Sequence, residues 1–154
     1  MWNWKHLFED KELVCYCDID SIINPDADED GIYLSVECYQ SIPVKTAAWM
    51  MFFIKNEDTI NRYREHRKSM GLSIDGYENF NNVLCLVELD AENYLYRVIP
   101  AGDYDENGNE IGTSAIITNR KKSFLKGIKA EWSPILKGKT HKSIFALFRF
   151  IYGS

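Results

Sequence analysis

A short acidic pattern that ends in glycine occurs twice in this chain of 154 residues and constrains its fold more than any other feature. The copies run from Asp26 to Gly31 and from Asp103 to Gly108, and both read D-x-D-x-[DN]-G. Asp, Asn and Gly are residues that tight turns prefer. Because residues of alternating character follow the first copy at 32–39 and precede the second at 94–99, we expect each copy to turn one strand back on the next. The chain should therefore form an antiparallel sheet.

The same pattern also begins a calcium-binding loop of the EF-hand type. In the first copy the residues at ligand positions are Asp26, Asp28, Asp30 and Glu37. Two features argue against this interpretation: Tyr33 stands where a compact aliphatic residue is expected, and a strand-like segment follows where an EF-hand has a helix. In the second copy, Ser114 replaces the bidentate carboxylate. We therefore predict no metal site and no cofactor, with weak calcium binding at the first copy as the alternative.

Further strands are predicted by short apolar or alternating segments. They cover residues 13–18, 32–39, 47–54, 83–90, 94–99 and 110–118. The first two should pair with each other through the first acidic turn. The last three should form a meander, joined at Asn93 and at the second acidic turn.

A helix is predicted at about 57–70. Asn56 is a suitable N-cap, and Gly71 is a suitable residue to end the helix. The stripe that should face the sheet consists of Ile60, Tyr63 and Arg67.

A second helix is predicted at about 141–152. Its apolar stripe has helical spacing and consists of Ile144, Leu147, Phe148 and Ile151. Together the elements predict one α+β domain over residues 1–154: a mostly antiparallel sheet of about six strands, with both helices packed on it.

Charge is divided unevenly along the chain, whose net charge is -5. Residues 1–118 carry 9 Lys/Arg and 22 Asp/Glu, whereas residues 119–154 carry 9 Lys/Arg and 1 Asp/Glu. The acidic body makes nucleic acid an unsuitable partner, since phosphate binding needs a positive surface. We expect the basic segment to pack beside the acidic body and neutralise it. If it instead contacts a protein partner, the candidate residues are Lys121, Lys122, Lys126, Lys129 and Trp132.

Catalytic motifs are absent from the sequence, which has neither a nucleophile elbow nor a glycine-rich phosphate loop. The histidines His6, His66 and His141 stand in three different segments, and His66 is predicted to be a solvated helix residue. We therefore predict that the protein is not an enzyme.

Cysteine usage and hydropathy bear on location. Four cysteines have neither zinc-ligand nor CxxC spacing, and we interpret them as reduced core thiols: Cys15, Cys17, Cys38 and Cys85. No apolar run reaches the ~20 residues that a membrane span needs. Since the sequence as written lacks a signal peptide, we expect a cytoplasmic protein, or one exported to the periplasm or cell surface if a signal has been removed.

Motifs along nearly the whole chain resemble the surface-adhesin E-like family of small bacterial proteins. They are Trp4, the segment CYCDIDSI at 15–22, VELD at 87–90, YRV at 96–98, the hairpin at 104–108 and WSPI at 132–135. The resemblance implies an antiparallel sheet flanked by helices, export, sometimes dimerisation and, in the adhesin itself, binding to host matrix proteins. Family members often pair a cysteine after the E-[LI]-D segment with one near the C-terminus. In this chain Ala91 follows the VELD segment, and there is no cysteine near the C-terminus.

The functional hypothesis is a non-enzymatic binding protein with a protein partner, self-associating through a sheet edge or an aromatic-rich surface. One alternative is a small enzyme or ligand-binding domain with a deep polar pocket between helix and sheet, containing His66 or a carboxylate pair. Another is an acidic inhibitor or immunity-type protein, suggested by the acidic body.

Overall fold

The computed structural model describes residues 2–24, 33–34, 43–117 and 123–153 of the chain. Its strands are β1 (Trp4–Glu9), β2 (Leu13–Asp18), β3 (Ile22–Ile23), β4 (Tyr33–Leu34), β5 (Lys45–Ile54), β6 (Phe80–Asp90), β7 (Leu95–Asp105), β8 (Glu110–Gly112) and β9 (Ser133–Pro134). The helices are α1 (Glu57–Ser69), the short 3-10 helix η1 (Tyr77–Asn79) and α2 (Lys142–Tyr152). The predicted α+β class is confirmed.

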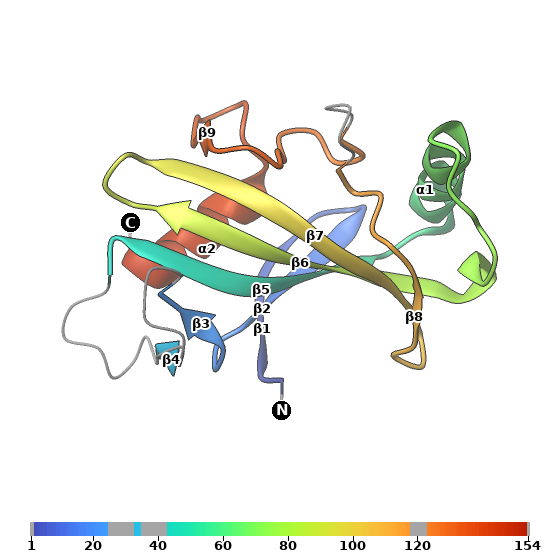
Figure 1. Cartoon of the computed structure of the whole chain (residues 1–154), viewed down its shortest axis with the longest axis horizontal. Helices are drawn as coiled ribbons and strands as arrows, with labels where there is room; N and C mark the ends of the chain where they lie inside the picture. The colour runs from blue at the N-terminus through green and yellow to red at the C-terminus, as the bar shows by residue number, and fades with distance from the viewer. Residues whose placement is uncertain (1, 25–32, 35–42, 118–122, 154) are drawn as a thin grey trace.

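One antiparallel sheet organises the molecule (Figure 1). Six of its nine strands follow each other in the order β1-β2-β5-β6-β7-β8, where about six strands in all were predicted. The short strands β3, β4 and β9 pair at its margins. The long β6–β7 hairpin lies within this order, and its strands pair from Asp90 and Leu95 to Phe80 and Asp105.

The predicted pairing of the N-terminal strands is wrong. β2 has β1 and β5 as its neighbours, so neither edge of β2 is left for residues 32–39. The described part of that segment, β4, pairs with β3 instead. Strand β1 was not expected, because Lys5, His6 and Glu9 give it a polar composition. These side chains are exposed, as is typical of an edge strand.

The two faces of the sheet differ. Phe52 lies opposite Val83, and Val83 lies opposite Asp103, so the three side chains point to the same side. This side, the covered face, carries the buried core residues Cys15, Met50, Phe52, Cys85 and Val87. Helix α2 packs across it (behind the sheet in Figure 1) and buries Ile144, Leu147 and Ile151, as its spacing predicted.

Helix α1 lies at the other end of the sheet from most of α2 (Figure 1). Asn56 caps it as predicted, since its side-chain oxygen accepts a 2.8 Å hydrogen bond from the Thr59 N–H. Its buried residues are Thr59, Tyr63 and Arg67. Because Tyr63 and Arg67 both contact Asp103 on the covered face, the two helices pack on the same side of the sheet.

The second acidic turn is a hairpin between β7 and β8, as predicted. Asp105 accepts hydrogen bonds from the backbone N–H groups of Asn107 and Asn109, each at 2.9 Å, and Gly108 has a φ of 82°. Asp103 is not part of the turn, because it is a strand residue of β7 and is fully buried. The first copy, including Asp26, Asp28 and Asp30 and the more distant Glu37, lies outside the described residues.

Segment 123–141 is packed against the sheet. Leu125 and Ile128 are buried, and the Tyr96 hydroxyl donates a 2.8 Å hydrogen bond to the Gly127 carbonyl. No helix among the described residues has the length and hydrophobicity to cross a bilayer. Cys15, Cys17 and Cys85 are buried free thiols, as predicted, and Cys38 is outside the described residues.

Candidate functional site

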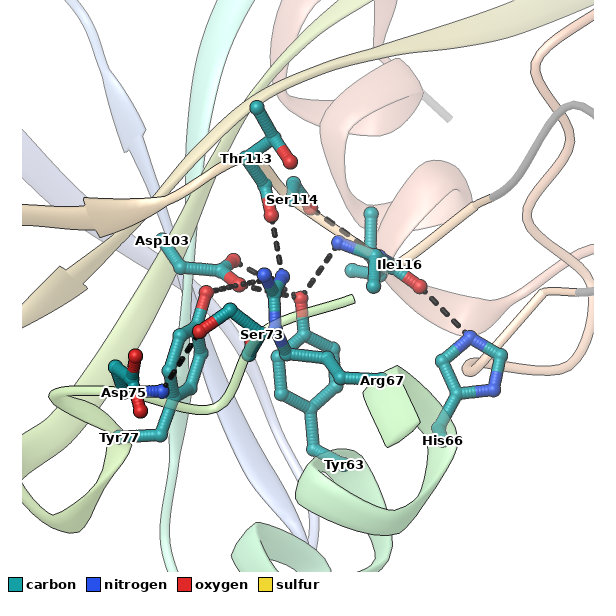
Figure 2. A network of polar contacts seen from close by, with 11 residues as sticks. Tyr63, His66, Arg67, Ser73, Asp75, Tyr77, Asp103, Thr113, Ser114 and Ile116 are labelled. Atoms are coloured by element: carbon teal, nitrogen blue, oxygen red, sulfur yellow. Dashed lines mark hydrogen bonds and ion pairs between the residues drawn. The ribbon is translucent and has the colours of Figure 1, made fainter. Parts of the chain in front are cut away.

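A buried polar network joins α1, η1, β7 and the chain after β8 (Figure 2). Its centre is the Asp103 carboxylate, which has no solvent exposure. The Tyr63 hydroxyl donates to Asp103 at 2.8 and 2.9 Å, the Tyr77 hydroxyl at 2.7 Å, and the Arg67 Nη1 at 3.2 Å. The Tyr63 oxygen also accepts a 2.8 Å hydrogen bond from the Ala115 N–H.

Arg67 carries the positive charge of this network and is only 3% exposed. Its guanidinium stacks on the Tyr77 ring, 4.3 Å from the ring centroid. It also donates to two backbone carbonyls, those of Ser73 and Thr113. The side chain therefore ties the end of α1 to the loop after it and to the chain after β8, which is a structural role.

The ionisation of the network follows from burial. Burial raises the pKa of Asp103 to about 6, although the hydrogen bonds from Tyr77 and Tyr63 and the charge of Arg67 act in the opposite direction. Burial, reinforced by the nearby Asp103, also raises the pKa of both tyrosines well above the ordinary value. The tyrosines are therefore neutral donors at physiological pH. Both hydroxyls donate to Asp103, and the Tyr63 oxygen also accepts from the Ala115 N–H, so the network joins α1, η1 and β7.

His66 is not a solvated helix residue, contrary to the prediction. Its Nε2 lies 2.9 Å from the Ala115 carbonyl oxygen, so this nitrogen carries the proton (Figure 2). The imidazole also packs beside Phe124, with ring centroids 5.7 Å apart. His66 thus holds the chain after β8 against α1, and it does not line the hollow described below.

The opposite side of the sheet, the open face, is rich in large apolar side chains. The cross-strand partners Tyr16, Met51 and Leu84 form one row, and the partners Trp49, Leu86 and Ile99 form the next. Ile99 is 39% exposed, and the other five are half-buried. No described helix crosses this side, which faces the viewer in Figure 1.

Two aromatic groups extend the open face. At one margin Trp2, which is 51% exposed, stacks on Trp4 and meets Trp49 edge to face. At the other margin Trp132 lies over Arg97, with the guanidinium 4.8 Å from the ring centroid. Arg97 in turn pairs with its cross-strand neighbour Glu88.

The residues predicted for a partner surface do not form one cluster. Trp132 adjoins the open face through Arg97, whereas Lys126 lines a hollow beside α2. Lys129 is exposed beside β7, where its carbonyl accepts a hydrogen bond from the Val98 N–H. Lys121 and Lys122 lie outside the described residues. The sequence missed the open face because β5 and β6 are apolar on both sides, so alternation did not reveal which side helices cover.

Among the described residues, no three His, Cys, Asp or Glu side chains gather closely enough to hold a metal ion. The fold and surfaces thus define a small α+β protein with one covered and one open sheet face. No family model, curated protein or solved structure matches the chain.

Proposed function

We propose that this chain is a non-enzymatic protein-binding domain whose partner docks on the open face of the sheet. The observation that carries the proposal is the pair of apolar rows formed by Tyr16, Met51 and Leu84 and by Trp49, Leu86 and Ile99. Contiguous exposed apolar patches on soluble proteins are typically interaction sites, because covering them removes apolar surface from water.

The residue types support a protein partner. Trp, Tyr, Phe, Met and Arg are enriched in protein interfaces, and the open face with its margins contains all five, including Phe53 and Arg97.

The sheet face is a better candidate than the sheet edge. The outer strand β1 exposes the charged or polar side chains Lys5, His6 and Glu9, and its register shifts between His6 and Phe8. Charges and irregularities on an edge strand oppose pairing with another strand. The resemblance to the surface-adhesin E-like family agrees with a binding role, and that membership remains a proposal.

The first partner to test is a second copy of this chain, by sedimentation velocity over a range of concentrations. We expect wild type to form dimers with rising concentration and Ile99→Glu to remain monomeric, because a carboxylate would be buried in the apolar interface. Leu136→Glu is the matched control, since Leu136 is 43% exposed and lies before α2. The proposal is wrong for self-association if wild type stays monomeric, or if Ile99→Glu associates as well as the control does.

A further inference from the structure

An open hollow of about 890 Å³ lies where the end of β1 meets the start of α2, away from the open face. Leu7, Phe8 and Phe145 form its apolar part. Five exposed cations surround it, from three stretches of the chain: Lys126, Lys137, Lys139, Lys142 and Arg149.

None of these five cations has an ion pair with any residue that the structure describes. The two acids of the hollow are engaged elsewhere. Glu9 pairs with Lys55 at 2.6 Å and with His6 at 3.2 Å. Asp10 accepts hydrogen bonds from the N–H groups of Glu12 and Leu13. We expected the acidic body to neutralise the basic segment, but among the described residues no ion pair does so at this hollow.

Hydrogen bonds and a close backbone approach hold the two lysine-bearing segments, 126–127 and 137–142, beside each other. The His141 N–H donates a 2.9 Å hydrogen bond to the Gly127 carbonyl, and a Cβ at Gly127 would lie 2.5 Å from the Lys139 oxygen. Thr140 accepts a 2.9 Å hydrogen bond from the Leu136 N–H through its hydroxyl. This close approach places Lys126 beside the turn that carries Lys137 and Lys139, so the cations converge because of the fold.

Five cations surround the hollow, whereas only two carboxylates line it and one of these, Glu9, is paired with Lys55. Positive charge is therefore in excess, and like charges repel each other unless a further anion binds. Lys142 adds to this, since it opens α2 where the helix dipole favours negative charge, and the first turn of α2 has no acidic residue. We propose that the hollow binds a small organic or inorganic polyanion that carries two or more phosphate or carboxylate groups. This inference is independent of the proposed function, because it concerns a different surface.

The size and lining of the hollow define the ligand class. Small-molecule sites are typically about 300–1,000 Å³, and the hollow lies within this range. Several anionic groups are favoured, because a single carboxylate or phosphate would balance only part of the excess positive charge around the hollow. Phe8 and Phe145 offer contact to an apolar part of the ligand.

The test is isothermal titration calorimetry of the whole chain with tripolyphosphate and, separately, with citrate, which distinguishes phosphate from carboxylate ligands. We expect at least one probe to bind with a submillimolar Kd, and Lys139→Gln/Lys142→Gln to weaken it about tenfold or more. The control Lys68→Gln/Lys129→Gln removes the same charge outside the hollow and should change the Kd less than about twofold. The affinity should also fall as salt rises.

Three results would overturn the proposal. One is that neither probe saturates a site at millimolar concentration. Another is that the two double variants weaken binding equally, which would indicate general attraction to charge. The third is that an oligoglutamate peptide binds while both probes fail, because the hollow would then be a surface for an acidic protein. All four lysines are exposed, so the variants should fold, and circular dichroism with a thermal melt checks this.

Discussion

Asp103 is expected to make the protein less stable as the pH rises, and replacing it with Asn should remove this effect. The folded state holds its proton more tightly than the unfolded chain does, because burial raises the pKa from 3.8 to about 6. The stability that protonated Asp103 contributes is therefore complete below the ordinary pKa and is lost as the pH rises through about 6.

The size of the effect follows from the shift. A shift of about two pKa units corresponds to about 3 kcal/mol in the free energy of unfolding. This is a large part of the ~5–15 kcal/mol that stabilises a typical domain. The burial that causes the shift is complete, since Asp103 has no exposed surface.

The assay is urea unfolding of wild type and Asp103→Asn between about pH 4 and about pH 7. The difference in unfolding free energy, wild type minus variant, should fall by about 2 kcal/mol over this range, because at about pH 4 the unfolded chain has already lost part of its proton. Asp105→Asn is the control on the same strand. Hydrogen bonds from the backbone of Asn109 lower the pKa of Asp105. The unfolding free energy of wild type minus that of Asp105→Asn should therefore rise with pH. A difference for Asp103→Asn that is constant or rises with pH would refute the argument that burial outweighs the hydrogen bonds and Arg67.

Three further predictions concern packing. Gly112→Ala should lower the free energy of unfolding by about 1–3 kcal/mol, because the added Cβ would collide with the Tyr77 hydroxyl. The loss should be smaller in a Tyr77→Phe background. Additive urea-unfolding energies would contradict this. Gly127→Ala should lower the free energy of unfolding by about 1–3 kcal/mol more than Gly138→Ala does. Both glycines have a positive φ, but only at Gly127 would the added Cβ collide with backbone atoms. Equal melting curves would contradict this. Burial raises the pKa of the thiols of Cys15, Cys17 and Cys85. Iodoacetamide should therefore label these thiols only after unfolding, as mapped by peptide mass spectrometry. Labelling of the native protein would contradict this.

Local signals in the sequence predicted the helices and most long strands well. The Asn56 cap and the spacing of Ile144, Leu147 and Ile151 depend on residues close in the chain, and both agree with the structure. The partner strands of β2 did not follow from such signals, because pairing depends on which distant segments compete for its edges. A turn pattern likewise did not reveal that its first residue, Asp103, belongs to the strand and is buried.

The candidate surfaces were the least predictable part. Trp132 was expected at a partner surface, and it does adjoin the open face, but only through its contact with Arg97 on another strand. Lys126 and Lys139 are far enough apart in sequence that only the close approach at Gly127 explains why both line one hollow. Such convergence depends on tertiary contacts, and composition alone indicated only that the segment was basic.

The most direct test of the central proposal is hydroxyl-radical footprinting of wild type at low and at high protein concentration, with oxidation measured residue by residue. If a second copy docks on the open face, Trp49, Met51 and Ile99 should become protected from oxidation at high concentration. Phe145 is the internal reference, because it lines the hollow beside α2 and should keep its reactivity. Unchanged oxidation of the open face, or protection confined to Phe145, would contradict the account.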